Sequence, residues 1–140
     1  MRPLHPFTPE WAAEFRAVIN SDAVYGEAAK NWVWTVAFVL HATPLLRAPL
    51  DIAVEFSLQG GTCVDARVVP ATEVTAAFIL AADYGVWRSM ARGTLDPVLA
   101  LAGRQIRLTG SVPELMLHAK AVRALIACAQ RVPTWFPDEL

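Results

Sequence analysis

Residues 83–110 read DYGVWRSMARGTLDPVLALAGRQIRLTG, and this stretch is the most informative about the fold because turn and cap signals are densest in it. Asp83 precedes a short apolar helix that ends at Gly93, and Asp96-Pro97 begins a second short helix. A carboxylate before the first turn accepts hydrogen bonds from free amides, and the fixed φ of proline suits the first helical position. The pattern therefore predicts two consecutive short helices.

The same stretch leads into a strand and the last helix. Gly103 is expected to end the second short helix with left-handed backbone angles. Residues 105–109 form a short strand, and Gly110 permits a tight corner. Ser111 then begins a long helix over 111–131. Apolar residues of this helix recur at alternating spacings of four and three, which places them on one face: Leu115, Ala119, Val122, Ile126 and Ala129. We expect this helix to pack on a sheet.

Two helices precede the first strand. Thr8 is a favourable cap for a helix over 9–20, and the apolar residues of that helix share one face: Trp11, Phe15 and Val18. Ser21 or Asp22 can cap a shorter helix that reaches about residue 30. These helices are expected to lie beside the sheet, since each has only one apolar side.

The middle of the chain has the period of strands. Residues 32–40 are apolar at both alternating sets of positions, as in a strand covered on each face. Residues 52–58 alternate apolar with polar positions, which indicates a half-exposed strand. Gly60-Gly61 predicts a hairpin turn, because paired glycines accept positive φ, and residues 62–69 form the return strand.

Alternation in the return strand predicts Val64, Ala66 and Val68 inward, and it predicts Cys63, Asp65 and Arg67 outward. A fourth strand over about 74–81 would complete an antiparallel meander. The fold class is therefore α+β, with a mainly antiparallel five-stranded twisted sheet covered by helices. One domain is expected over 1–140.

Composition limits the functions that this chain can have. Hydrophobic residues make up 55% and charged residues 18%, so the chain has an unusual amount of apolar surface to bury. A thick core, an oligomer interface or an internal cavity would each absorb it. No apolar run is long enough to span a membrane, no signal peptide is visible, and the two cysteines have no metal-type spacing. We expect a cytoplasmic protein.

Charge is unevenly distributed along the chain. Residues 1–87 hold five basic and nine acidic side chains, whereas residues 88–131 hold seven basic and two acidic ones. Solvated surface charges explain this pattern, and so does contact with an anionic headgroup, a coenzyme A phosphate or a membrane surface. Nucleic acid is not expected as a partner, because no basic run is interleaved with aromatic residues.

The landmarks of 83–110 resemble those of the sterol carrier protein 2 family. The shared features are an acidic residue with an aromatic one turn later, then Gly93-Thr94-Leu95-Asp96-Pro97, then the Gly103 to Gly110 strand, then a long amphipathic helix. The resemblance extends over about 11–131. Without targeting signals, the chain resembles a stand-alone bacterial-type member.

The resemblance implies a hydrophobic tunnel between the sheet and the helices, in which family members bind sterols, fatty acids, acyl-CoAs or other apolar molecules. It implies no catalytic residue and no cofactor. Position in the predicted elements then gives the candidate ligand-binding residues: Trp34, Phe38, Phe56, Phe78, Leu80, Trp87, Met90, Leu115, Met116, Ala119, Val122 and Ile126. Each of these residues could equally be plain core.

An enzyme is not expected, because no constellation of catalytic residues is visible. His5, His41 and His118 are scattered, no serine has a nucleophile-elbow context, and no metal-ligand spacing occurs. Two functions remain: non-catalytic carriage of an apolar ligand, or an interaction module that dimerises or docks on a lipid- or acyl-CoA-metabolising enzyme. Trp135-Phe136 is a candidate for that contact, or for a lid over the tunnel.

Overall fold

The computed structural model describes residues 2–139, so Met1 and Leu140 of the expected domain lie outside the described residues. The helices and strands, with the short 3₁₀ turns η1 to η3, follow in the order α1 (Pro9–Ser21), α2 (Ala23–Ala28), β1 (Val33–Leu40), η1 (Pro44–Leu46), β2 (Ile52–Gln59), β3 (Thr62–Pro70), η2 (Ala71–Glu73), β4 (Phe78–Ala82), α3 (Tyr84–Ala91), α4 (Pro97–Ala102), β5 (Arg107–Thr109), α5 (Val112–Leu117), α6 (Ala119–Cys128) and η3 (Ala129–Arg131).

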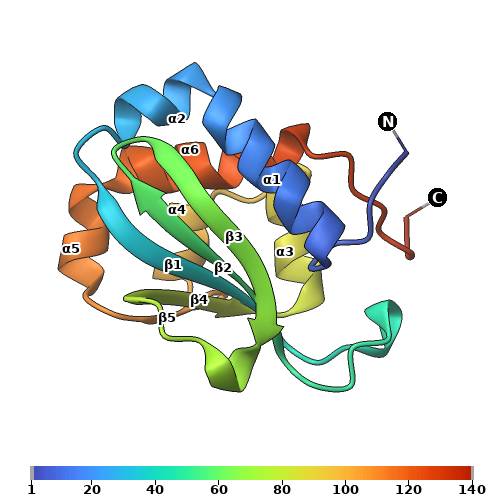
Figure 1. The fold of residues 1–140 in the computed structure, drawn as a ribbon. Helices are drawn as coiled ribbons and strands as arrows, with labels where there is room; N and C mark the ends of the chain where they lie inside the picture. The colour runs from blue at the N-terminus through green and yellow to red at the C-terminus, as the bar shows by residue number, and fades with distance from the viewer. Residues whose placement is uncertain (1, 140) are drawn as a thin grey trace.

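The five strands form one sheet in the order β3-β2-β1-β4-β5, with α1, α3 and α6 gathered to one side of it (Figure 1). The fold class is α+β, as predicted. Aromatic rings join the layers: the Phe15 ring of α1 lies 6.1 Å from that of Phe38 on β1 and 5.1 Å from that of Phe56 on β2. No helix among residues 2–139 is both long enough and apolar enough to cross a membrane.

Local cap chemistry accounts for most helix starts. The side-chain oxygens of Thr8, Asp22, Asp96 and Ser111 each accept a hydrogen bond from an amide in the first turn of the following helix. Asp83 holds the cap position of α3 but makes no such bond, because its carboxylate contacts His41 Nδ1 at 2.8 Å. The predicted helix starts are therefore confirmed, with a different role for this one carboxylate.

The predicted meander is wrong at its fourth strand. β4 pairs in parallel with β1, with Val36 opposite Phe78, and does not extend from β3. Residues 74–77 belong to the connection between β3 and β4, which is held by two hydrogen bonds: Thr75 N donates to Glu55 Oε2 at 2.9 Å, and Ala77 N donates to Thr35 Oγ1 at 2.9 Å. β1 is therefore the central strand, with β2 on one edge and β4 on the other. Its two apolar faces suit this position, because a central strand is covered on both faces.

Two further expectations are corrected. The β2–β3 pairing shifts register at Ser57/Leu58, so Leu58 pairs with Cys63 and Val64 is left over. This bulge buries Cys63 and exposes Val64, the reverse of the predicted alternation. Left-handed angles after α4 occur at Arg104, with a φ of 61°, whereas Gly103 has a φ of −82°.

The last helix is broken near its first third. His118 has a φ of −112° and a ψ of 32°, so α5 ends at Leu117 and α6 begins at Ala119. The His118 ring packs against two indoles, with ring centroids 6.1 Å from Trp32 and 4.9 Å from Trp34. The predicted continuous helix over 111–131 is therefore two helices and a 3₁₀ turn, with an aromatic contact at the break.

Candidate ligand-binding site

A small, largely enclosed apolar cavity lies between the sheet and the helices. Its volume is about 20 Å³, which is room for about one water molecule. We call it the internal cavity, and its walls are Pro6, Phe7, Trp11, Phe15, Phe38, Trp87, Met90, Ala91, Ile126, Ala129 and Phe136. The tunnel expected between the layers is thus, in this structure, a small void narrowed by large side chains.

The walls of the internal cavity offer no free hydrogen-bonding side chain. Trp11 Nε1 donates to Thr134 Oγ1 at 2.9 Å, and Trp87 Nε1 donates to the Val39 carbonyl oxygen at 2.9 Å. The remaining wall side chains are hydrocarbon or thioether. A polar atom that entered the cavity would lose its hydrogen bonds to water without replacement, so the cavity suits apolar groups only.

An open groove lies beside the internal cavity. Its volume is about 500 Å³, and we call it the surface groove. It is lined by His5, Pro6, Phe7, Thr8, Leu40, Leu46, Arg47, Ala48, Pro49, Leu50, Asp51, Ile52, Val68, Val69 and Pro70. The groove is lined mostly by apolar residues and carries a cation, Arg47, which forms no ion pair among residues 2–139. It can therefore accommodate a molecule that is partly apolar and partly charged.

Pro6 and Phe7 line both the internal cavity and the surface groove. The Phe7 ring stacks on Trp11 at a centroid distance of 5.2 Å and meets Trp87 edge-on at 5.8 Å. Phe7 has a φ of 60°, which is unfavourable for a bulky side chain. One strained aromatic residue thus stands between the two spaces.

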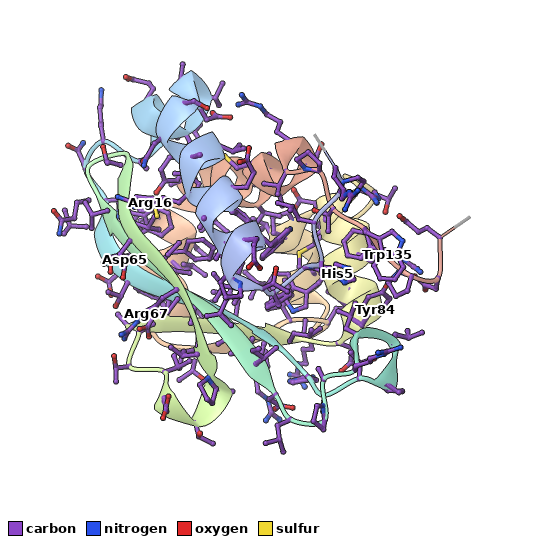
Figure 2. All side chains as sticks on the ribbon, turned by 45° about the vertical axis from the view of Figure 1, so that its right-hand side comes forward. His5, Arg16, Asp65, Arg67, Tyr84 and Trp135 are labelled. Atoms are coloured by element: carbon purple, nitrogen blue, oxygen red, sulfur yellow. The ribbon has the colours of Figure 1, made fainter. Side chains whose placement is uncertain are left out.

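The two ends of the chain close the same side of the cavity. Leu4 N donates to the Pro133 carbonyl and Trp135 N donates to the Leu4 carbonyl, each at 2.8 Å, in a short parallel bridge. Figure 2 shows His5 and Trp135 side by side, and their ring centroids are 4.7 Å apart. Figure 1 shows both termini on that side of the molecule.

Polar contacts hold residues 136–139 against α3. Tyr84 Oη donates to Asp138 Oδ1 at 2.6 Å, Arg88 also pairs with Asp138, and Arg92 pairs with Glu139 at 2.6 Å. The Arg92 guanidinium holds the pKa of Glu139 below its usual value. Phe136, which these contacts flank, is buried in the cavity wall, whereas Trp135 is 44% exposed. Phe136 is therefore a fixed part of the cavity wall, and Trp135 is not.

The structure brings four of the sequence-predicted ligand residues to the internal cavity: Phe38, Trp87, Met90 and Ile126. Five others are buried outside both spaces: Phe56, Phe78, Leu80, Leu115 and Val122. The remaining three, Trp34, Met116 and Ala119, are partly buried. The centroid of the Trp34 indole lies 4.0 Å from that of the Phe78 ring. Met116 lies in a separate groove beside β5.

Several cavity residues were not predicted, above all Phe7. Trp11 and Phe15 lie on the predicted apolar face of α1, so the periodicity of the sequence indicated that their side chains face inward. Phe7 has no periodic signal, because it precedes the helix. An apolar residue just before a capping threonine, as in Phe7-Thr8, often packs against the first helical turn. This pattern could have indicated that Phe7 is buried.

Outside the two spaces, His41 pairs with Asp83. The pair is exposed, and no hydroxyl or thiol among residues 2–139 is hydrogen-bonded to it. Within residues 2–139, no group of three or more His, Cys, Asp or Glu side chains is placed to hold a metal ion. Burial raises the pKa of Cys63 to about 11 and that of Cys128 to about 12, so both thiols stay protonated at neutral pH.

Comparison with known proteins adds solved structures only. No family model matches the chain, and no curated protein matches it. A crystal structure of sterol carrier protein 2 is 29% identical with a TM-score of 0.87, covering 91% of this chain and 99% of that one. A conserved hypothetical protein of Thermus thermophilus, described as a candidate sterol carrier protein, is 28% identical with a TM-score of 0.87, covering 96% and 94%.

A more distant structure has the same fold. The palmitated sterol carrier protein 2-like 2 of Aedes aegypti is 12% identical with a TM-score of 0.51, covering 77% of this chain and 90% of that one. The first two matches extend over nearly the whole of both chains at 28–29% identity. The chain therefore has the fold of a sterol carrier protein 2-type domain.

Proposed function

We propose that this chain binds and carries one apolar ligand between its sheet and its helices, without catalysing a reaction. The ligand is a sterol, a fatty acid, an acyl-CoA or a similar lipid. The observation that carries the proposal is the internal cavity, whose walls are apolar and whose indole donors are already bonded within the protein. Only a ligand part without hydrogen-bonding needs is stable there.

A bound ligand requires more room than the internal cavity now has. Pockets for small molecules have volumes of about 300–1,000 Å³, so the walls must rearrange. Met90 suits such a rearrangement, because its unbranched thioether side chain adapts its shape. Burying roughly 200–300 Å² of ligand surface would contribute roughly 5–8 kcal/mol before the costs of ordering are subtracted.

The surface groove supports a place for the polar end of the ligand. Arg47 is an exposed residue in its lining, and His5 and Thr8 supply further polar groups close to Phe7 in the sequence. An amphipathic ligand could leave its headgroup there, in contact with water and Arg47, while its chain enters the cavity. Transient contact with a membrane surface during loading, and a cytoplasmic location, stay predictions.

Native mass spectrometry of gently purified protein tests the proposed function. We expect a bound apolar mass that organic extraction removes, and we expect the extracted protein to rebind a fluorescent fatty-acid probe. A protein that is empty as purified and binds neither a fatty-acid nor a sterol probe would contradict the proposal.

A matched pair of variants places the ligand. Ala129 lines the internal cavity and Ala124 does not, although each is 8% exposed. Ala129→Leu should fill the cavity and abolish probe binding, whereas Ala124→Leu should retain it. Equal binding by both variants would place the ligand elsewhere in the protein.

A second candidate function is an interaction module that dimerises or docks on an enzyme. A groove of about 490 Å³ beside the edge strand β5 favours it, since apolar residues of α4 and α5 meet Arg104 and Arg107 there. The same native mass spectra test this function through the mass of the assembly. A strictly monomeric protein would count against a homodimer.

A further inference from the structure

We infer that Phe7 is the gate between the surface groove and the internal cavity, and that its ring must leave the cavity wall before an apolar ligand can enter. This inference rests on the proposed function and adds the route of entry and the residue that controls it. Phe7 and its neighbour Pro6 are the residues common to the walls of both spaces. Displacement of the Phe7 ring would join the two volumes of about 20 and 500 Å³.

The backbone at Phe7 is arranged so that it can move by itself. Among residues 2–139, neither the N–H nor the carbonyl of Phe7 takes part in a backbone hydrogen bond outside the helices and strands. The turn of Pro6 and Phe7 is anchored on both sides, by the Leu4 bridge to Pro133 and Trp135 and by the Thr8 cap of α1. The turn can therefore change conformation while both anchors stay in place.

Strain favours this movement. Phe7 has a φ of 60°, a region that a bulky side chain adopts only when its surroundings compensate. The compensation here is the contact of its ring with the indoles of Trp11 and Trp87. A ligand chain that reached these indoles would replace that contact, and the turn would then be free to take a more favourable conformation.

The closed form explains how a nearly filled core can accept a ligand. The Phe7 ring occupies the place against Trp11 and Trp87 that a ligand chain would take, so only a small apolar cavity is left in the empty protein. The indoles are covered in both end states, by the ring in the empty protein and by the ligand in the complex. The association rate constant should therefore depend on how often the ring leaves, not on a large opening of the sheet and helices.

Stopped-flow kinetics with cis-parinaric acid test the gate, because Trp11 and Trp87 in the cavity wall can transfer excitation energy to a probe bound beside them. The variant is Phe7→Ala, which removes the ring. If the open form is a minor state populated at about 1–10%, removing the gate should raise the association rate about tenfold or more. Because the bound ligand already occupies the place of the ring, the dissociation rate should change less, and the dissociation constant should fall by about the factor by which association accelerates.

Phe136→Ala is the matched control. Phe136 is 3% exposed and Phe7 is 4% exposed, and both line the internal cavity, but Phe136 does not line the surface groove. The Phe136→Ala variant should have a larger cavity that is still not open to the groove. Its association rate for the probe should therefore stay close to that of the unmodified protein. Equal acceleration by the two variants would show that loosened packing, and not a gate at Phe7, sets the rate.

Phe7→Gly guards against loss of fold in Phe7→Ala, since glycine takes a φ of 60° without strain. Thermal denaturation establishes that each variant is folded before its rates are compared. An unmodified protein that binds the probe with the same rates as folded Phe7→Gly would overturn the gate and leave the proposed function standing. A protein that binds no probe in any form would overturn both.

Discussion

The internal cavity and the surface groove share Pro6 and Phe7 but differ in chemistry and in access. The cavity has about 20 Å³ of free space, is largely enclosed and has no unpaired polar side chain in its walls. The groove has about 500 Å³, is open to solvent and carries Arg47 and Asp51. One space can take only hydrocarbon, and the other can hold a charged group in water. Their junction is therefore the place where an amphipathic molecule would be divided.

The comparison also shows how the protein keeps an apolar site without exposing it. An exposed apolar surface of the size that a lipid needs promotes aggregation. Here the potential site is filled by the protein's own side chains from α1, α3, α6 and both chain ends. Three experiments test this contrast, and they follow in order of decreasing effect.

Removal of Met90 should distinguish the cavity from ordinary core. Met90 and Leu115 are each 1% exposed, but only Met90 lines the internal cavity. Either residue changed to Ala should lower the free energy of unfolding by about 2–5 kcal/mol. A saturating fatty-acid probe should restore thermal stability further in Met90→Ala than in Leu115→Ala, because it fills the added space. Equal restoration would remove the distinction between cavity and core.

Loss of the hydrogen-bond partner of Trp11 Nε1 should have the next largest effect on stability. Thr134→Val removes the oxygen that accepts from Trp11 Nε1, inside a wall that otherwise has no unpaired polar group. We expect a loss of about 1–3 kcal/mol in chemical denaturation. Thr134→Ser keeps the hydroxyl and should lose less. The double variant Thr134→Val with Trp11→Phe should recover part of the loss, and strict additivity would contradict a direct interaction.

The smallest effect concerns pH and the C-terminal cover of the cavity. Because Arg92 lowers the pKa of Glu139 in the folded protein, their contact stabilises closure above the usual carboxyl pKa of 4.5 and is lost as the pH falls through the lower, folded value. Dissociation of cis-parinaric acid methyl ester, which has no titrating group, should accelerate as the pH falls below about 4.5.

Glu139→Gln should already release this ester slightly faster at neutral pH and should show a weaker acceleration in acid. Glu114→Gln is the control, since Glu114 is an exposed carboxylate on α5 that forms no ion pair among the described residues. If both variants follow the unmodified protein at every pH, the Arg92–Glu139 contact has no part in closure.

Much of the fold could be predicted from local chemistry. Thr8, Asp22, Asp96 and Ser111 all cap the helices that they were expected to cap, and the Gly60-Gly61 turn has positive φ at both glycines. Such signals depend on neighbours in the sequence. The pairing of β4 with β1 depends on distant residues instead. It is set by the central position of β1 and by the hydrogen bonds of Glu55 and Thr35 to the segment between β3 and β4.

The candidate site was less predictable for the same reason. Periodicity identifies residues that face inward, and it correctly turned Phe38, Met90 and Ile126 toward the core. It does not say which inward residues border a void, and Leu115 and Val122 on the same side do not. Phe7 and Phe136 lie outside regular elements, so their positions depend on the bridge between the chain ends.

That bridge has a consequence for folding. Trp11 and Thr134, which it brings together, are 123 positions apart, and contacts between such distant segments form late because the entropy of closing the chain opposes them. The layers can therefore assemble before the ends meet, and segments at chain ends are also the first to fray in the native state. The chain ends, which cover one side of the internal cavity, are therefore expected to be the last part of the protein to join the folded sheet and helices.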